Sequence, residues 1–396
     1  MKSLKCFLKR FKLVVCFVQI LHNIKAKIKI FIFRYIFCCK KIEQKKIVFE
    51  NFNGKGYAGY PRIIAEELIK QNVDADYVWI SHNKPDNLPH NFRWVKYGTK
   101  ASFFEYSSAH IWIDNVKNNI KPKKKNGQFY IQTWHSLGPG LKAAEKDAID
   151  KLSKEYICLS IKDSKIIDLM ISSCEWQTQN YRKSYWYDGE IMPIELNVNP
   201  TDSVRIETKK KVLQYLKLEN DINLLLYAPT FRKDNNISCY SLDYKMIKNA
   251  LEIRFGGKWK VLVRFHPNIS DVSFHEYGKD VINVSDYDNI FDLLISSDFY
   301  ITDYSSPIFD CYRYGIKSAI FASDYDDYCK NDRALYFDLK KLPSTFSNNN
   351  NQLYENIINF DEKLYYTEAN NLVSKLGYYF EDRELKPIID LINSII

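Results

Sequence analysis

Short apolar runs and amphipathic segments follow one another along most of the chain. Apolar runs of about four to eight residues are typical of buried strands, and apolar residues at every third or fourth position are typical of helices. From residue 45 onward the two patterns alternate, which is typical of a doubly wound parallel sheet. In the first half the pattern predicts strands at 45–51, 76–81, 92–97, 110–114 and 129–133, with helices at 61–70 and 102–108.

A polar stretch interrupts this alternation near the middle of the chain. Residues 197–202 read Asn-Val-Asn-Pro-Thr-Asp, and Pro and Asn commonly mark breaks in regular structure. A chain of 396 residues is long for one hydrophobic core and suits two. We therefore expect one Rossmann-like domain at 43–200 and a second at 201–396.

The second half repeats the alternation of the first. Strands are expected to begin near residues 224, 260, 299 and 315, and a tight turn near 305 leads into a helix that starts at Pro307. Residues 324–327 are expected to form an acidic turn and residues 348–351 a loop. Further helices are expected at 205–218, 288–297, 352–359, 363–376 and 386–396.

The first 42 residues have a different character. Apolar residues recur there at spacings of three and four with lysines between them, which predicts a basic amphipathic helix. The longest uncharged run, 13–24, has about 12 residues, against the ~20 needed to span a bilayer. We expect this segment to lie in the surface of an anionic membrane. A signal peptide and a helix packed on the body are the alternatives, but no small-residue cleavage site follows the apolar run.

Charge and cysteine content narrow the class of protein. Residues 1–46 contain thirteen Lys and Arg and one acid, so the rest of the chain is slightly acidic although the whole carries +9. A nucleic-acid-binding enzyme would spread its positive charge over the catalytic body, so we expect no nucleic-acid partner. The nine cysteines include no CxxC pair or zinc-site spacing, which is typical of reduced thiols in a cytosolic protein.

Polar residues that suit an anion follow three consecutive strands of the second half. Thr230 and Arg232 end the first of these strands, and Arg264 and His266 end the second. The third is followed by a Ser-Ser-Pro sequence at a helix start, where hydroxyls and backbone amides can bind phosphate. Ligands of open α/β sheets bind at the carboxyl ends of strands, so we expect these groups to gather at one site.

A further candidate follows the strand at 129–133. His135 stands at the strand end, and glycines at 138 and 140 leave space beside it for a ligand. A structural histidine is the alternative interpretation. The pair Gly54 and Gly56 suggests a dinucleotide loop, but the full G-x-G-x-x-G pattern is absent, so a backbone turn is the better interpretation.

Taken together, these segments resemble the CDP-glycerol glycerophosphotransferase family, the teichoic acid primases and polymerases of bacteria. The resemblance runs from about residue 45 to the C-terminus, and residues 51–61 and 333–338 add to it. The linker at 195–202 departs from the family pattern because it lacks an arginine. The motifs that carry the resemblance are Trp134-His135 with Lys142, residues 228–232, residues 264–267, and residues 301–306 with Phe309-Asp310.

The resemblance implies a GT-B fold, with two Rossmann-like domains that face each other across a cleft. It also implies transfer of glycerol phosphate from CDP-glycerol, or ribitol phosphate from CDP-ribitol, to a hydroxyl of a lipid-linked polymer, with release of CMP. Such a protein would sit peripherally on the cytoplasmic face of the membrane. By this analogy His135 is the general base, and His266 and Arg264 stabilise charge on the diphosphate. The remaining donor-binding residues would be Thr230, Arg232, Ser305, Ser306, Asp310 and Lys142.

Two other functions fit the same pattern. A GT-B glycosyltransferase that uses a nucleotide sugar for capsule or lipid-linked glycan synthesis would share the fold and the phosphate site. A non-catalytic membrane-binding scaffold would share only the fold. The acid pairs at 286–288 and 324–327 resemble the DxD of metal-dependent transferases, but such pairs are common in loops, and we expect no metal ion and no cofactor.

Overall fold

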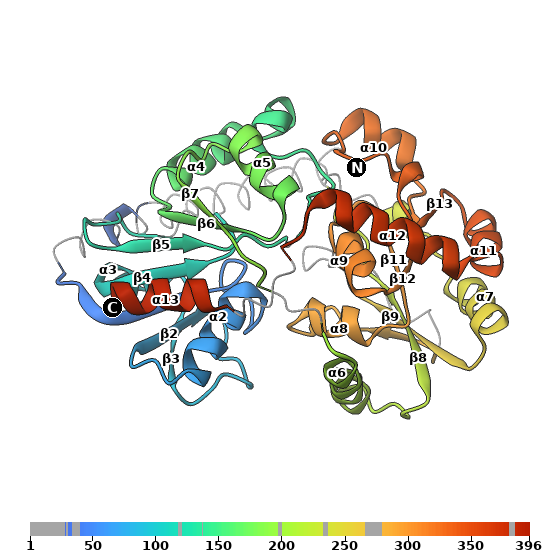
Figure 1. Cartoon of the computed structure of the whole chain (residues 1–396), viewed down its shortest axis with the longest axis horizontal. Helices are drawn as coiled ribbons and strands as arrows, with labels where there is room; N and C mark the ends of the chain where they lie inside the picture. The colour runs from blue at the N-terminus through green and yellow to red at the C-terminus, as the bar shows by residue number, and fades with distance from the viewer. Residues whose placement is uncertain are drawn as a thin grey trace, which may run out of the picture.

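The computed structural model describes two α/β domains placed side by side (Figure 1). The described residues are 28, 31–33, 40–117, 121–136, 138–196, 200–232, 237–265, 279–379 and 385–396. Most of the predicted membrane segment 1–42 therefore lies outside the described residues, as does His266. Within the described ranges, the helices are too short or too polar to cross a bilayer.

The first domain is built on a parallel sheet in the order β3-β2-β1-β4-β5-β6-β7. From β1 the chain adds β2 and β3 toward one edge of the sheet. It then returns to the other side of β1, where β4 to β7 extend toward the opposite edge, so the strand order reverses between β1 and β4. Ligands of such sheets bind at this reversal. The strands are β1 (Glu43–Glu50), β2 (Asp76–Ser81), β3 (Phe92–Lys96), β4 (Ala109–Asp114), β5 (Phe129–Gln132), β6 (Leu169–Ser172) and β7 (Glu190–Pro193).

Helices cover both faces of this sheet, as expected for right-handed crossovers between parallel strands. Their starts follow local chemistry: Thr99 caps α3 by accepting from the amide of Ser102, and Ser153 caps α4 in the same way. The connecting elements are α2 (Gly59–Lys70), α3 (Lys100–Ser108), η1 (Glu145–Lys151), α4 (Lys154–Ser164) and α5 (Glu175–Ser184).

The second domain repeats the same topology with the strand order β10-β9-β8-β11-β12-β13, again all parallel. Its strands are β8 (Ile222–Tyr227), β9 (Lys258–Val263), β10 (Val281–Asn283), β11 (Phe299–Thr302), β12 (Lys317–Phe321) and β13 (Thr345–Ser347). Its helices are α6 (Asp202–Tyr215), η2 (Ile237–Tyr240), α7 (Tyr244–Phe255), α8 (Ile290–Ser296), α9 (Pro307–Tyr314), α10 (Tyr325–Asn331), η4 (Leu339–Lys341), α11 (Asn350–Ile358) and α12 (Glu362–Leu376). The predicted α/β class with two Rossmann-like sheets is confirmed.

Two predicted loops of the second domain are partly helical. Residues 324–327 were expected to be an acidic turn, but helix α10 begins at Tyr325. Residues 348–351 were expected to be a loop, but α11 begins at Asn350 because the side chain of Asn349 accepts a hydrogen bond from the amide of Gln352. The asparagine run therefore supplies an N-cap.

The last helix, α13 (Lys386–Ile395), returns to the first domain although it follows the second sheet in the chain. Figure 1 shows it in red beside α2. Ile388, Ile389 and Ile392 are fully buried in the hydrophobic core that also contains Ile64 and Leu68 of α2.

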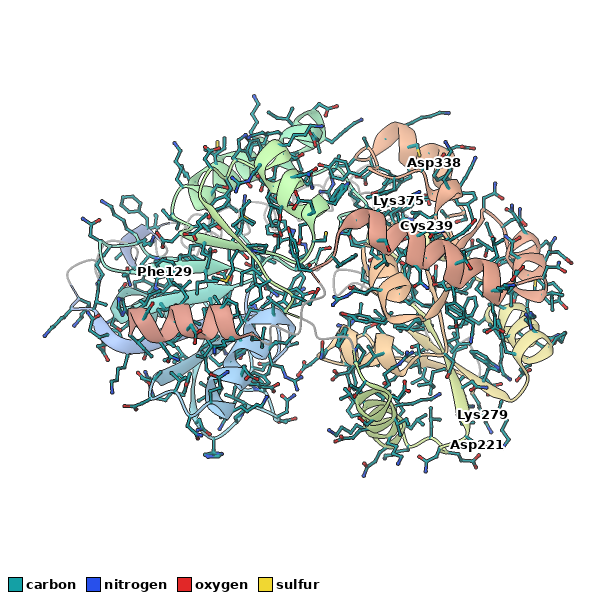
Figure 2. All side chains as sticks on the ribbon, in the orientation of Figure 1. Phe129, Asp221, Cys239, Lys279, Asp338 and Lys375 are labelled. Carbon is teal, nitrogen blue, oxygen red and sulfur yellow. The ribbon has the colours of Figure 1, made fainter. Side chains whose placement is uncertain are left out.

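The carboxyl ends of both sheets point toward the other domain. The loop after β5 pairs with the segment after α10: the amide of Ala143 donates to the carbonyl of Ala334 at 2.7 Å, and the amide of Tyr336 donates to the carbonyl of Leu141 at 2.8 Å. We call this pairing of residues 141–143 with 334–336 the interdomain ladder. Figure 2 shows the opposite, amino ends on the outside, with Phe129 at the start of β5 and Asp221 just before β8.

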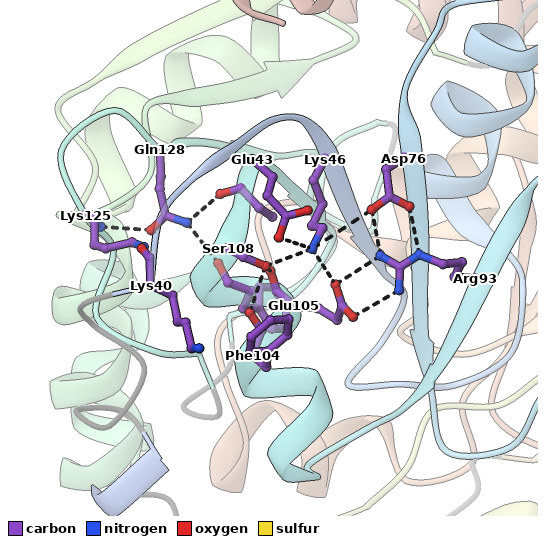
Figure 3. A network of polar contacts seen from close by, with 12 residues as sticks. Lys40, Glu43, Lys46, Asp76, Arg93, Phe104, Glu105, Ser108, Lys125 and Gln128 are labelled. Carbon is purple, nitrogen blue, oxygen red and sulfur yellow. Dashed lines mark hydrogen bonds and ion pairs between the residues drawn. The ribbon is translucent and has the colours of Figure 1, made fainter.

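An ion network secures the amino end of the first sheet (Figure 3). Lys46 is 3% exposed and contacts Glu43 at 2.8 Å and Glu105 at 3.0 Å. Arg93 joins Glu105 to Asp76 through contacts of 3.0 and 2.6 Å. Burial acts to raise the pKa of Glu105, but the two cations keep it below its ordinary value. This network holds β1, β2, β3 and α3 together at the edge away from the interdomain ladder.

The packing of α13 gives the first testable prediction. Ile389→Ala removes a fully buried side chain and should lower the free energy of unfolding by about 2–5 kcal/mol. Hydrogen exchange should accelerate in α2 and β1 of the first domain, and not in β8 or β11. The exposed neighbour Asn393→Ala is the control and should change neither quantity. Faster exchange confined to the second domain would contradict the observed packing.

Candidate active site

His135 lies beyond the end of β5, in a loop whose backbone the preceding residues fix. The amide of Thr133 donates to the carbonyl of Asp114 at 2.9 Å, which extends the pairing of β5 with β4. Trp134 adopts a left-handed conformation with φ of 58°, and its amide donates to the Gln132 side chain at 2.9 Å. A left-handed non-glycine residue is strained, so this side-chain bond stabilises the turn that directs His135 away from the strand.

Hydrogen bonding defines which nitrogen of His135 carries the proton. Nδ1 lies 3.1 Å from the carbonyl oxygen of Asn115. A carbonyl can only accept, so Nδ1 carries the hydrogen and Nε2 of the neutral ring keeps its lone pair. The ring also packs against Trp134 and Phe52, with centroid distances of 4.5 and 5.1 Å. Contacts on several sides thus orient a ring that can accept a proton at Nε2.

The surroundings keep this ring neutral. His135 is an exposed residue, although the loops after β1, β4 and β5 surround its ring on several sides. The protein atoms that surround the ring displace part of its water and lower the pKa of His135 from 6.5 to about 4; the Asn115 carbonyl opposes the shift, and the charge of Arg333 adds to it. At neutral pH His135 is therefore a proton acceptor.

A pair of asparagines links the loops around His135. Nδ2 of Asn115 donates to Oδ1 of Asn51 at 2.7 Å, and Oδ1 of Asn115 accepts from the amide of Phe52 at 2.9 Å. The same residue therefore holds His135 through its carbonyl and Phe52 through its side chain. Gly54 and Gly56, which follow Asn51 in the chain, both have positive φ and form a backbone turn. A Cβ atom at Gly56 would lie 2.6 Å from Oδ1 of Asp288 in the second domain. This close approach explains the glycine and brings the two domains into contact.

A buried ionic network underlies the His135 loop, and the sequence analysis did not identify it. Asp114 accepts from Gln132 and from the Tyr130 hydroxyl, each at 2.7 Å, and pairs with Lys121 at 2.6 Å. Burial raises the pKa of Asp114 to about 6, and Lys121 opposes this shift. Since Gln132 binds both Asp114 and the Trp134 amide, the network supports the turn before His135. In the sequence, the polar residues Asp114 and Gln132 at the ends of two apolar strands, with Lys121 between these strands, could have indicated this network.

Arg232, predicted to bind the donor, contacts two carboxylates in the structure. Its guanidinium contacts Asp303 at 2.7 Å and Asp324 at 2.7 Å, and only 5% of the residue is exposed. Asp303 also accepts from the amide of Thr230 at 2.8 Å. The arginine and Asp303 therefore join the ends of β8, β11 and β12. Thr230 lies at this point with a buried hydroxyl that has no partner among the described residues.

Arg264 follows β9, as predicted, but its guanidinium is directed at backbone. It donates to the carbonyls of Val284 and Tyr287, in the segment between β10 and α8. Burial lowers the pKa of Arg264, and Asp288 and Asp286 oppose this shift. The structure thus gives Arg264 a role in holding the loop beside β10, and His266 two residues later lies outside the described residues.

Ser305 and Ser306 precede α9, as predicted, with Pro307 in its first turn. Ser306 occupies the N-cap position, but its hydroxyl makes no bond to the helix. The hydroxyl instead accepts from the amide of Leu141 in the first domain, at 3.3 Å. The expected capping bond is therefore replaced by an interdomain contact, which places the start of α9 directly beside the loop after His135.

Asp310 lies in the first turn of α9 and faces the first domain. Burial raises its pKa to about 7, and Arg313 opposes this shift. One carboxyl oxygen, Oδ1, is buried without a partner among the described residues. Its charge acts on Tyr60 of α2 and on Tyr378. A carboxyl in this state can donate or accept a hydrogen bond, which suits a hydroxyl ligand.

Lys142 lies in the interdomain ladder opposite Leu335. Its ammonium is 5.4 Å from the ring centroid of Tyr328. Burial lowers the pKa of Lys142 to about 7; the carboxylate of Asp303 opposes this shift and the charge of Arg333 adds to it. Lys142 and Asp303 thus approach each other from different domains, and a nearby anion would stabilise the charged form of the lysine.

The predicted site residues therefore fall into connected groups at the carboxyl ends of both sheets. His135 and Lys142 come from the first domain, and Ser306 and Asp310 meet that domain from α9. The acid pairs are used in other ways: Asp324 binds Arg232, and Asp288 accepts from the amide of Tyr57. Among the residues that the structure describes, no cluster of three His, Cys, Asp or Glu is suited to a metal ion.

The depressed pKa of His135 gives the second prediction. In the folded protein the 13Cε1 resonance of His135 should titrate with a midpoint well below 6.5, near 4, as measured by NMR and assigned with His135→Asn. The unfolded chain takes up this proton at higher pH than the folded one does. The wild-type protein should therefore lose stability as the pH falls from 6.5 toward 4, and the variant should lose less. A midpoint at or above 6.5 would contradict the described surroundings.

The ion pairs of Arg232 give the third prediction. Arg232→Met leaves two buried carboxylates without their partner and should lower the free energy of unfolding by about 3–5 kcal/mol, as measured by urea denaturation without ligand. Lys211→Met removes an exposed pair with Glu207 and should change stability little. Equal stability of the two variants would show that Arg232 does not join the strand ends.

Comparison with known proteins adds to this geometry. Residues 32–392 match the family described as CDP-glycerol:poly(glycerophosphate) glycerophosphotransferase. The chain is 31% identical over 321 residues to the teichoic acid poly(glycerol phosphate) polymerase of Staphylococcus epidermidis, which covers 76% of this chain and 44% of that protein. It is 26% identical over 360 residues to the teichoic acid glycerol-phosphate transferase of Staphylococcus aureus, covering 87% and 91%.

Solved structures agree with these relatives. A structure of the wall teichoic acid polymerase TagF with CDPG aligns with a TM-score of 0.78 at 27% identity, covering 96% of this chain and 97% of that one. The predicted GT-B-like architecture is confirmed by this similarity. The chain spans less than half the length of the first curated relatives it matches. The extent of the family match nevertheless shows that the chain belongs to the CDP-glycerol:poly(glycerophosphate) glycerophosphotransferase family.

Proposed function

We propose that the protein transfers glycerol phosphate from CDP-glycerol to a hydroxyl of a membrane-linked cell-surface polymer and releases CMP. The observation that carries this proposal is His135, a neutral imidazole with Nδ1 held by the Asn115 carbonyl and with an acceptor at Nε2. Family membership supplies the reaction class. The names of the relatives support a glycerol phosphate donor first, and the ribitol-phosphate polymerases among them make CDP-ribitol the second candidate.

In the proposed reaction His135 acts as general base. Nε2 takes the proton of the acceptor hydroxyl while the oxygen attacks the phosphorus that carries glycerol. The bond from this phosphorus to the bridging oxygen breaks, and its electron pair leaves with CMP. No covalent enzyme intermediate is required, because positioning and fixed positive charge can carry phosphoryl transfer.

The second domain would hold the donor. The start of α9 at Ser305 and Ser306 offers amides and hydroxyls at a positive helix end, and Lys142 adds a cation from the other domain. His266 and Arg264 are proposed to lie near the diphosphate. Thr230 keeps a buried hydroxyl for the donor, whereas Arg232 supports this region through its carboxylate partners.

Asp310 is proposed to bind a hydroxyl of the donor polyol. Its partnerless Oδ1 can accept such a bond, and with a pKa raised to about 7 the carboxyl can also donate one. Because the Asp310 carboxyl can be neutral near pH 7, it can bind the uncharged polyol without leaving a buried negative charge between the domains.

The proposals for the acceptor side and for the location rest on the first domain and on the segment that precedes it. We infer that a lipid-linked polymer enters beside His135 and Phe52, and 40% of the Phe52 surface is exposed. The basic segment 1–42 would bring the protein to the cytoplasmic face of an anionic membrane as a peripheral protein, and its sequence pattern supports this role.

The fourth prediction tests the general base. His135→Asn keeps the size and the hydrogen-bonding of the ring partly intact but removes the basic Nε2, so CMP release from CDP-glycerol should fall about 10²–10⁴-fold. His266→Ala should also abolish CMP release. CMP is quantified by ion-exchange chromatography, and the melting temperature of each variant should match that of the wild type.

Product analysis separates this function from its alternatives. Mass spectrometry should find CMP and a new phosphodiester when CDP-glycerol and an acceptor are supplied. A glycosidic product from a nucleotide sugar would support the glycosyltransferase alternative. Wild-type turnover by His135→Asn would exclude the proposed base.

A further inference from the structure

Arg333 brings a cation to the domain interface that the sequence analysis did not assign to the site. It follows α10 directly, and the adjacent Ala334 accepts a hydrogen bond from Ala143 in the interdomain ladder. The backbone amide of Arg333 donates to the side chain of Asp332 at 2.7 Å. The position of Arg333 is therefore fixed by backbone contacts from both domains and does not depend on its own guanidinium.

The guanidinium itself is poorly satisfied. One terminal nitrogen donates to the carbonyl of Ala143 at a long 3.5 Å. Nε is buried and has no acceptor among the described residues. A buried donor without a partner is unfavourable, and more so when it is charged, so the structure keeps Arg333 in an unfavourable state. Such a state is relieved when an anion binds.

Other buried arginines show the contrast. Arg232 contacts Asp303 and Asp324, each at 2.7 Å, and Arg313 contacts Glu195 at 2.9 Å. In the described part of the chain no ion pair to Arg333 is found within 4.0 Å. The two paired arginines hold parts of the protein together, whereas Arg333 keeps charge-assisted donors for another group.

The charges around Arg333 indicate what this group is. Lys142 pairs with Leu335 in the ladder, and the Arg333 guanidinium reaches the carbonyl of Ala143 beside it, so the two cations come from neighbouring backbone positions. The charge of Arg333 also acts on His135 and Lys142. Two cations in a partly buried interface repel each other, and an anion between them removes this repulsion. The planar guanidinium offers paired donors that match two oxygens of a phosphate group.

We propose that Arg333, together with Lys142, binds the diphosphate of the nucleotide donor at the interdomain ladder. This inference rests on the proposed function. The bond between the glycerol-bearing phosphorus and the bridging oxygen breaks in the reaction, and negative charge grows on the departing CMP. Arg333 stabilises that charge, and because the ladder joins both domains the cation pair is complete only when the ladder is formed.

The fifth prediction uses Arg333→Gln and Arg333→Lys in the full chain. Calorimetry with CDP should show a loss of affinity of at least about tenfold for Arg333→Gln, and a smaller loss for Arg333→Lys, which keeps the charge without the paired donors. Affinity for cytidine, which has no phosphate, should stay unchanged. The exposed Arg182→Gln on α5 is the matched control and should bind CDP as the wild type does.

A kinetic measurement separates ligand binding from a purely structural role. The charge of Arg333 lowers the pKa of His135, so its removal should move the acidic limb of the kcat/KM profile to higher pH. Arg333→Lys should keep the wild-type limb, because the charge remains. A variant that is only less stable would lose activity at every pH without this shift.

The outcomes distinguish the inference from the function on which it rests. If the wild type releases CMP from CDP-glycerol while Arg333→Gln binds CDP as tightly, the inference is wrong and the function stands. A change confined to the KM of the acceptor would also overturn it. If the wild type neither binds CDP nor turns over CDP-glycerol, the proposed function fails, and the inference fails with it.

Discussion

Backbone hydrogen bonds between two short segments hold the candidate site together. Residues 141–143 follow the His135 loop, and residues 334–336 follow α10 of the other domain; the ladder between them has bonds of 2.7 and 2.8 Å. Lys142 and Arg333 both belong to this region, and Ser306 joins it through the Leu141 amide. Because backbone groups make these bonds, the side chains of the same residues stay available for a ligand.

The polar groups beneath the site divide into those that bind one another and those that do not. Arg232 with its two carboxylates and Lys121 with Asp114 form closed pairs, which give the strand ends a fixed geometry. Thr230, Asp310 and Arg333 each retain a buried polar atom without a described partner. Unsatisfied buried atoms are rare in folded proteins, and these three lie at the carboxyl ends of the strands or in the segments that follow them. These three are the ones proposed to meet the donor, whereas other such atoms, for example those of Ser107 and Thr345, lie elsewhere in the two domains.

The fold could be predicted from sequence because its signals are local. Strand β11, the turn at Ser305 and helix α9 arise from a pattern of about sixteen residues, and the same is true of β5 with His135. The partners of polar residues could not be predicted in this way. Arg232 meets Asp303 and Asp324, which lie 71 and 92 positions further along the chain. Its arginine type suggested a phosphate ligand, and only the tertiary structure shows the carboxylates.

The other differences between the predictions and the structure also come from partners that are distant in the sequence or from single side-chain bonds. Ser306 stands where an N-cap is expected, but a backbone amide from the first domain is its partner. Asn349 was part of an asparagine-rich run that suggested a loop, yet one side-chain bond makes it a helix start. Arg333 begins the stretch 333–338 that added to the family resemblance, but the sequence indicated no role for it. Its Nε has no described partner, and that is visible only once the surrounding residues are placed.

The return of α13 to the first domain has a mechanical consequence. The polypeptide passes between the domains twice, once after β7 and once before α13, so two covalent connections join them. Two connections tether the domains more closely than one would, so the interdomain ladder forms between partners that the chain already holds near each other.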